Sequence, residues 1–198
     1  MSEWEEAQKE ELSFWGDCSD TYGEETKQFV YMRKMGFRPT STWRSPVSFN
    51  GMGKSYIDIG GGPCSILLKF INTGRRFVID PCEYPSWVPH RYANCGILYA
   101  RGPGEKLDRR AREVFFGSLA FDVAFIYNVL QHVDDPELII KNALEISKEL
   151  HMFEWIDIPP HPGHPQMLTA ENLERWTGLK GTIEYINENG CVGKAWYV

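Results

Sequence analysis

The stretch Ser55-Tyr56-Ile57-Asp58-Ile59-Gly60-Gly61-Gly62-Pro63-Cys64-Ser65 decides the fold of this chain. It begins as a short apolar run with β-branched residues, which is typical of a buried strand. Consecutive glycines and then an apolar run follow, so the pattern predicts a strand, a tight turn and a helix over 65–72. Glycines at such a turn let the backbone approach a ligand. The next helix would offer free N–H groups and the positive end of its dipole, with Ser65 as N-cap.

Two carboxylates make this pattern more specific. Asp58 lies two residues before Gly60, near the carboxyl end of the first strand. Asp80 closes the next apolar run, over 76–80, about 20 residues farther along the chain, where α/β nucleotide sites place an acidic side chain against ribose hydroxyls. The sequence therefore predicts a nucleotide site at the carboxyl ends of two parallel strands.

The motif D-I-G-G-G-P-C-S resembles the first motif of class I S-adenosylmethionine-dependent methyltransferases, acidic-x-Gly-x-Gly-x-Gly. The chain departs from the family pattern at the third glycine, which is Cys64. The resemblance implies S-adenosyl-L-methionine as the cofactor, with Asp58 near its methionine amino group, the glycines 60–62 on the pocket floor and Asp80 on the ribose.

A dinucleotide site is the alternative, because Gly60-x-Gly62-x-x-Ser65 is close to the pattern G-x-G-x-x-[GA]. Three considerations favour the methyl donor. The charge of Asp58 suits an ammonium group and opposes a pyrophosphate; the rest of the chain is short for a separate substrate domain; and the chain ends with a predicted hairpin. A nicotinamide-dependent oxidoreductase and a non-catalytic donor-binding or scaffold protein both stay open as alternatives.

The segment over 121–136 reads F-D-V-A-F-I-Y-N-V-L-Q-H-V-D-D-P and carries a second resemblance. Its near-continuous apolar first half predicts a central parallel strand. The second half resembles the fourth-strand signature of small-molecule and biosynthetic methyltransferases, L-x-H-[VI]-x-D-P. By that resemblance Asn128 and Val129 lie against the donor and His132 lies at the rim. Asp135 and Pro136 then begin a helix.

The third predicted strand, over 96–100, leads to a loop where relatives carry an acidic residue that binds the adenine amino group. This chain has Pro103 there, so adenine recognition would depend on backbone groups near Gly104, on Glu105 or on water. Pro81 follows the predicted ribose acid and is placed to border the adenine. The cofactor-binding residues that the resemblance implies are Asp58, Gly60, Gly61, Gly62, Asp80, Pro81, Gly104, Glu105, Asn128 and Val129.

Two histidines are candidate general bases. His132 could take a proton from an attacking hydroxyl or amine, because histidine titrates near neutrality; a role that only braces the loop is the alternative. A fifth strand is predicted over 150–158, and the proline-rich loop after it contains His161 and His164. This spacing is a weak metal signal, since no helix sets it and no carboxylate or thiol completes a set. We predict no metal and assign His164 to acceptor contact or to a second base.

The first 54 residues predict helices over 2–16 and 24–35, followed by a connecting segment. In class I methyltransferases the segment before the first strand often folds over the donor or shapes the acceptor pocket. The alternative is that Trp15 and Tyr31 only dock these helices on the sheet. The candidates for lid contacts are Trp15, Tyr22, Lys27 and Tyr31.

The end of the chain predicts a helix over 169–177 and strands over 181–187 and 191–198 around Glu188-Asn189-Gly190, a hairpin signal. The predicted fold class is α/β: a doubly wound, Rossmann-like seven-stranded sheet with a C-terminal antiparallel hairpin and an N-terminal helical extension. We expect the extension over 1–54 and the S-adenosylmethionine-binding methyltransferase domain over 55–198.

The composition limits the binding partners and the methyl acceptors that are expected. The 198 residues carry a formal charge of −6, and Lys and Arg form no run, which disfavours nucleic acid and anionic membranes as partners. The five cysteines form no C-x-x-C pair, and there is neither a signal sequence nor a long apolar span, so we expect a cytoplasmic protein. The absence of a D-P-P-Y-type tetrad after the fourth strand disfavours DNA-base amino groups as acceptors. A small molecule, a sugar or a nucleotide-linked metabolite is the expected acceptor.

Overall fold

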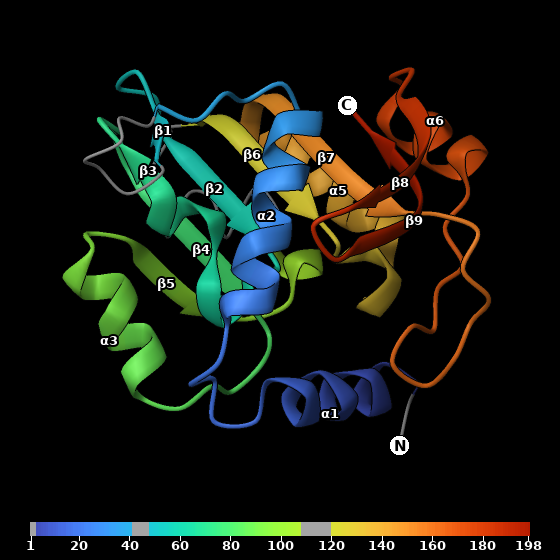
Figure 1. Ribbon diagram of the computed structural model, residues 1–198, viewed down its shortest axis with the longest axis horizontal. Helices are drawn as coiled ribbons and strands as arrows, with labels where there is room; N and C mark the ends of the chain where they lie inside the picture. The colour runs from blue at the N-terminus through green and yellow to red at the C-terminus, as the bar shows by residue number, and fades with distance from the viewer. Residues whose placement is uncertain (1–2, 41–47, 108–119) are drawn as a thin grey trace.

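The computed structural model describes residues 3–40, 48–107 and 120–198. A seven-stranded sheet with the order β5-β4-β2-β6-β7-β9-β8 forms the centre of the molecule (Figure 1). Its strands are β2 (Tyr56–Ile59), β4 (Arg76–Asp80), β5 (Leu98–Arg101), β6 (Phe121–Tyr127), β7 (Ser147–Trp155), β8 (Thr182–Glu188) and β9 (Cys191–Tyr197). The α-helices are α1 (Glu3–Trp15), α2 (Tyr22–Lys34), α3 (Trp87–Asn94), α5 (Pro136–Ile146) and α6 (Ala170–Thr177).

The topology of this sheet confirms the predicted fold class. Strands β5, β4, β2, β6 and β7 are parallel, and β9 joins β7 in the antiparallel direction and closes the hairpin with β8. The chain winds outward from β2 through β4 to β5 and then returns to the other side of β2 with β6. The carboxyl ends of β2 and β6 are therefore the topological switch point, where open α/β sheets bind ligands.

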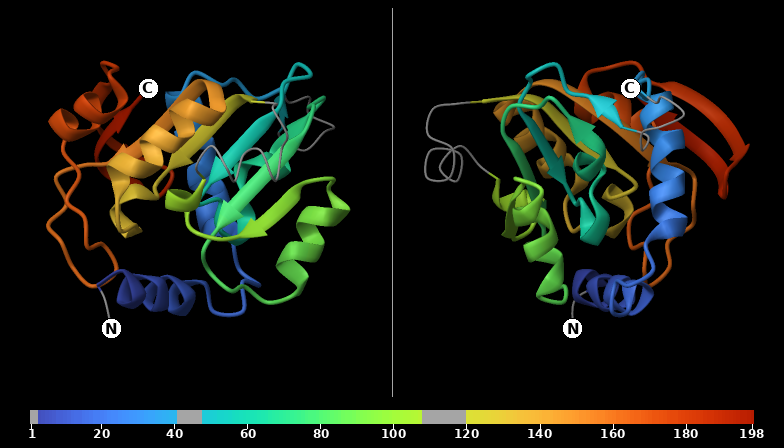
Figure 2. Two further views of the ribbon diagram at one scale, coloured as in Figure 1. Left: turned by 180° about the vertical axis from the view of Figure 1, so that it is seen from behind. Right: turned by 60° about the vertical axis from the view of Figure 1, so that its left-hand side comes forward.

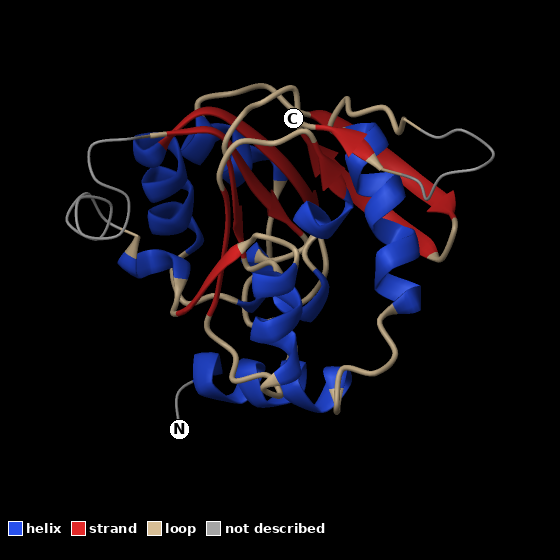
Figure 3. Cartoon of the chain, turned by 90° about the vertical axis from the view of Figure 1, so that its left-hand side faces the viewer, coloured by secondary structure: helices blue, strands red, loops and turns tan. Residues whose placement is uncertain are grey.

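Helices cover both faces of the sheet, as the views from behind and from the side show (Figures 2 and 3), and the buried side chains form two apolar cores. One core joins α2 and α3 to the sheet through residues such as Tyr31 and Tyr92. The other joins α5 and α6 through residues such as Ile140 and Leu173. The strand β2 is buried at all four positions, which matches its sequence except at Asp58.

Local signals placed several element boundaries correctly. The carboxylate of Asp135 accepts a hydrogen bond from the Leu138 N–H and caps α5, with Pro136 at its first position. The hydroxyl of Thr169 caps α6, which ends at Gly178 in the left-handed conformation. In the β8–β9 turn, Asn189 and Gly190 have positive φ, as the hairpin signal predicts.

The helix predicted over 65–72 is wrong. The segment forms a single 3₁₀ turn, η2 (Ile66–Lys69), which follows another, η1 (Gly62–Cys64), and it continues directly into the short strand β3 (Phe70–Ile71). This strand pairs with β1 (Phe49–Asn50), which the sequence did not indicate. The ring of Phe70 packs against several aromatic rings of the core, so strand pairing and aromatic packing outweigh the local helical pattern.

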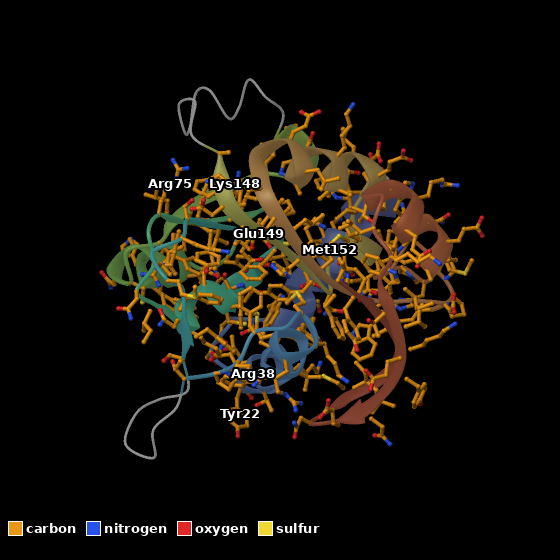
Figure 4. The ribbon with its side chains drawn as sticks, turned by 90° about the horizontal axis from the view of Figure 1, so that it is seen from above. Tyr22, Arg38, Arg75, Lys148, Glu149 and Met152 are labelled. Atoms are coloured by element: carbon orange, nitrogen blue, oxygen red, sulfur yellow. The ribbon has the colours of Figure 1, made fainter. Side chains whose placement is uncertain are left out.

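The N-terminal helices lie on the two sides of the switch point. Helix α2 packs on one face of the sheet, and α1 runs across the carboxyl ends of the strands at the bottom of Figure 1. Figure 4 views the molecule from the opposite end, where Lys148 and Glu149 mark the start of β7. The predicted helices over 2–16 and 24–35 are thus present, and they border the same edge of the sheet as the glycine turn.

Candidate functional site

The glycine turn after β2 occupies the switch point and requires its glycines. Gly60 and Gly62 have φ of +76° and +61°, a region that residues with a Cβ rarely adopt. A Cβ at Gly60 would lie 2.5 Å from the Cγ1 of Val129, and a Cβ at Gly61 would lie 2.8 Å from the Oδ2 of Asp58. The turn therefore packs tightly against the loop after β6 and against the carboxylate beneath it.

Asp58 lies fully buried beneath this turn. Its Oδ2 accepts hydrogen bonds from the Ser65 hydroxyl at 2.5 Å and from the Tyr127 hydroxyl at 2.9 Å. Burial raises the pKa of Asp58 to about 7, against the lowering effect of these hydrogen bonds. Through these two hydrogen bonds Asp58 supports the turn from beneath.

Asp80, by contrast, connects the turn to the second strand and lines a cavity. Its Oδ2 accepts a hydrogen bond from the Gly62 N–H and its Oδ1 accepts one from the Cys82 N–H, both at 2.9 Å. Burial raises the pKa of Asp80 to about 6. The side chain borders a small cavity together with Gly60, Pro81 and Val129. The acid at the end of β4 is thus held at the switch point by the glycine turn itself.

A larger cavity of about 320 Å³ lies over the glycine turn. It is enclosed by the two N-terminal helices, the loops after β6 and β7, and the β8–β9 turn. Both candidate bases, His132 and His164, line it. The described residues that line it are Glu11, Phe14, Trp15, Glu24, Lys27, Gln28, Tyr31, Gly60, Gly61, Gly62, Cys64, Tyr127, Asn128, Gln131, His132, Trp155, His164, Gly190 and Val192.

The two histidines come together from different loops, with ring centroids 4.4 Å apart. The Nδ1 of His132 lies 2.7 Å from the carbonyl oxygen of Gly163. A carbonyl can only accept, so Nδ1 carries the proton and Nε2 keeps its lone pair. Burial lowers the pKa of His132 to about 4, and burial together with the neighbouring His132 lowers the pKa of His164 to about 4. Both rings are therefore neutral at pH 7.

Comparison with solved structures finds the same fold in several methyltransferases. The N-methyltransferase NodS from Bradyrhizobium japonicum, in complex with S-adenosyl-L-homocysteine, superposes with a TM-score of 0.60 at 13% identity, covering 99% of this chain and 97% of that one. A SAM-dependent methyltransferase from Thermotoga maritima, described as a possible histamine N-methyltransferase, gives 0.57 at 13% identity over 99% and 98%. Magnesium protoporphyrin IX methyltransferase from Synechocystis, with bound SAM, gives 0.56 at 11% identity over 94% and 87%.

This chain has the class I methyltransferase fold. The fold that the two motifs imply is thereby confirmed. No protein-family model matches the sequence, and no curated protein matches it. The likeness is thus one of structure, at low sequence identity.

In this methyltransferase fold the loop after β6 is held by a buried acid. Asn128 has a φ of +56°, and its side-chain oxygen accepts a hydrogen bond from the Gln131 amide. The N–H groups of Val129 and Leu130 donate to the carboxylate of Glu154 on β7 at 3.2–3.3 Å. Glu154 is fully buried, and burial raises its pKa to about 8. Glu154 therefore fixes the Val129 side chain against Gly60.

These buried carboxyls predict how stability depends on pH. Folding raises the pKa of Glu154 from 4.5 to about 8 and that of Asp58 from 3.8 to about 7. Between pH 6.5 and 8 the folded state thus binds more protons at these groups than the unfolded state, so the free energy of unfolding falls as pH rises. The lowered pKa values of His132 and His164 act in the opposite sense, mainly below their ordinary value of 6.5.

Glu154→Gln removes the titratable group at this position. In this variant we expect the decrease in the free energy of unfolding between pH 6.5 and 8 to be smaller by about 1–2 kcal/mol, since one pKa unit corresponds to about 1.4 kcal/mol. Urea unfolding at both pH values measures it. Glu149→Gln is the matched control, because Glu149 lies on the same strand with a lowered pKa and stays ionised throughout this range. If the free energy of unfolding of Glu154→Gln depended on pH as steeply as that of the wild type, the prediction would be contradicted.

Two further predicted cofactor residues, Gly104 and Glu105, contact the region of α5. The carboxylate of Glu105 accepts hydrogen bonds from the N–H groups of Asp134 and Asp135 at 3.2–3.3 Å, so it is engaged at the start of α5. The carbonyl of Gly104 accepts from Asn142, and a Cβ at Gly104 would lie 2.8 Å from Ile59. Both residues belong to the α5 side of the structure.

Several cavity residues were not predicted from the sequence. Tyr127 lies at the end of an apolar strand, and its buried hydroxyl donates to Asp58. A buried tyrosine hydroxyl usually needs a hydrogen-bond partner, and this was the one sequence signal for a role of Tyr127. No sequence signal indicated that the cavity would be lined by Glu11, Trp155 and Val192, because they reach it through the packing of distant elements. No group of three metal-ligating side chains occurs among the described residues, and none of the described helices is long and apolar enough to cross a membrane.

Proposed function

We propose that this chain is an S-adenosylmethionine-dependent methyltransferase that acts on a small molecule. One observation carries the proposal: the small cavity that Asp80 borders and the large cavity that His164 borders share lining residues. An acid suited to ribose hydroxyls and a pair of neutral imidazoles thus border adjoining cavities at the switch point. The residues common to both cavities are Glu11, Gly60, Asn128 and His132.

The residues present fit the methyl donor. The turn over 60–62 offers backbone without side chains, so a ligand can approach it closely. Each oxygen of Asp80 accepts one N–H in the described structure, which leaves acceptor capacity for ribose hydroxyls. Pro81, Asn128 and Val129 border the same small cavity. In this proposal Asp58 supports the turn, and Gly104 and Glu105 have no direct role.

The mechanism follows from positioning. The donor, when bound, supplies an electrophilic methyl group on a sulfonium. The protein has to align the acceptor for in-line attack and to exclude water. The Nε2 of His132 can accept the proton of an attacking hydroxyl or amine, because Gly163 holds the other ring nitrogen as a proton donor. His164 lies beside it and can orient the acceptor.

The acceptor and the N-terminal region form part of the same proposal. A cavity of about 320 Å³ suits a small acceptor, and the similar structures include an N-methyltransferase and a magnesium protoporphyrin IX methyltransferase.

We assign the N-terminal 1–54 as a helical lid on the donor-binding domain 55–198. Trp15, Lys27 and Tyr31 line the cavity, whereas Tyr22 is 80% exposed and lies at the molecular periphery (Figure 4).

Isothermal titration tests the cofactor. We expect saturable binding of S-adenosyl-L-homocysteine and none of NAD. Asp80→Ala should weaken binding by about 1.5–3 kcal/mol, the range for hydrogen bonds to a charged group. Asp122→Ala is the control, because its carboxylate also accepts hydrogen bonds but lies at the amino end of β6. Saturable NAD binding without S-adenosyl-L-homocysteine binding would support the oxidoreductase alternative and contradict the proposal.

A further inference from the structure

The methionine end of the donor is a zwitterion, and the groups expected to bind it are either inaccessible or engaged elsewhere. Asp58 lies beneath the turn with no exposed surface: its Oδ2 accepts two hydrogen bonds, and its Oδ1, although it has no hydrogen-bond partner among the described residues, is equally buried. No α-helix begins at Ser65, and the Ser65 and Ile66 N–H groups donate to the Tyr92 and Tyr127 hydroxyls at 2.8 and 3.0 Å. A cavity that takes an α-amino acid end needs another cation for its carboxylate and another acceptor for its ammonium group.

Helix α2 presents both charges to the cavity. The Nζ of Lys27 lies 3.3 Å from the Oε2 of Glu24, one helical turn earlier, and both side chains line the cavity. Lys27 is the one lysine or arginine among the described residues that line it. The Lys27 side chain is 33% exposed and the Glu24 side chain is 12% exposed, so the pair is largely shielded from bulk water.

The pair also lies close to the glycine turn. The side-chain amide of Gln28, the residue after Lys27, donates a hydrogen bond to the Cys64 carbonyl at 2.7 Å and so docks α2 on the end of this turn. The charge of Glu24 contributes to the raised pKa of Cys64, for which burial is the main cause. It contributes in the same way to the raised pKa of Glu11 on α1. Glu24 therefore acts across the cavity.

We propose that Lys27 binds the α-carboxylate and Glu24 the α-ammonium group of the donor's methionine end, an inference that rests on the proposed function. Lys27 and Glu24 present a positive and a negative charge side by side, which matches the opposite charges of an α-amino acid. When such a ligand enters, Lys27 exchanges the Glu24 carboxylate for the ligand carboxylate, and Glu24 exchanges the Lys27 ammonium group for the ligand ammonium group. No buried charge is left unpaired, which is the condition under which such exchange is favourable.

Titration with two ligands tests this assignment. S-adenosyl-L-homocysteine carries the amino acid end, and 5′-methylthioadenosine has the same nucleoside but lacks it. Lys27→Met should weaken binding of the first ligand about 10- to 100-fold, the loss expected for a hydrogen bond between charged groups. Binding of 5′-methylthioadenosine should stay within about twofold of wild type. Glu24→Gln should show the same selective loss with a smaller magnitude.

Lys34→Met is the matched control: the same substitution on the same helix, but at a lysine paired with Glu184 on β8, outside the cavity. It should bind both ligands as the wild type does. Unchanged S-adenosyl-L-homocysteine affinity in Lys27→Met would overturn the assignment, as would an equal loss for both ligands, which indicates displacement of α2. Wild-type protein that binds neither ligand would instead overturn the proposed function itself, so the two failures are distinguishable.

Discussion

A single methyl group added at Gly60 should reduce the affinity for S-adenosyl-L-homocysteine at least about 100-fold, a loss of about 2.7 kcal/mol. The Cβ of an alanine at this position would lie 2.5 and 2.6 Å from the two methyl carbons of Val129. The φ of +76° adds strain for any residue with a Cβ. The turn would have to move away from the position in which it borders both cavities.

Val129 cannot easily yield to this contact. Its N–H donates to the buried Glu154 carboxylate, so the backbone of the loop after β6 is held in place. The turn is therefore expected to give way, and with it the Gly62 N–H that binds Asp80. Isothermal titration measures the loss, and circular dichroism measures whether the variant folds.

Gly23→Ala is the control for the Gly60 substitution. Gly23 lies in the first turn of α2, and an added Cβ would meet no atom within 4 Å. Alanine favours helix over glycine, so this variant should be at least as stable as the wild type and should bind the ligand equally well. A folded Gly60→Ala protein with wild-type affinity would show that the turn over 60–62 is not the donor site.

The second large effect concerns His132. In His132→Ala we expect kcat for a hydroxyl acceptor to fall about 10²–10⁴-fold, the usual contribution of a general base, while S-adenosyl-L-homocysteine affinity changes little. The reason is geometric: Nδ1 is held by the Gly163 carbonyl, and the ring lines the cavity, where its Nε2 has one long contact of 3.4 Å with the Gln131 side-chain amide. Turnover and titration on the same preparation separate the two quantities.

His164→Ala is the natural comparison, since its ring also lines the cavity but the described structure shows no hydrogen bond to its buried Nδ1. We expect it to raise KM more than it lowers kcat. For an acceptor that is already nucleophilic, the loss in His132→Ala should be small and should appear mostly in KM. Full activity of the double alanine variant would remove both histidines as bases and leave positioning as the mechanism.

The sequence by itself determined the elements whose cause is local. The strand before Gly60 follows from an apolar run, and α5 begins where Asp135 and Pro136 cap it. The final hairpin follows from the Asn189-Gly190 turn, because its positive φ values suit those residues. Each of these signals lies within a few residues of the element that it controls. Together they were enough to indicate the α/β fold with a closing hairpin, which the similar structures confirm.

Only the tertiary structure decided the shape of the site, because its determinants are far apart in the chain. The segment over 65–72 is not a helix, since Phe70 belongs to a strand paired with Phe49 and the freed N–H groups reach the Tyr92 and Tyr127 hydroxyls. Contacts across such distances leave no periodic signal in the residues that make them. For the same reason the sequence could name Lys27 only as one of four candidates for lid contacts, and it could not show that Lys27 pairs with Glu24 at the cavity.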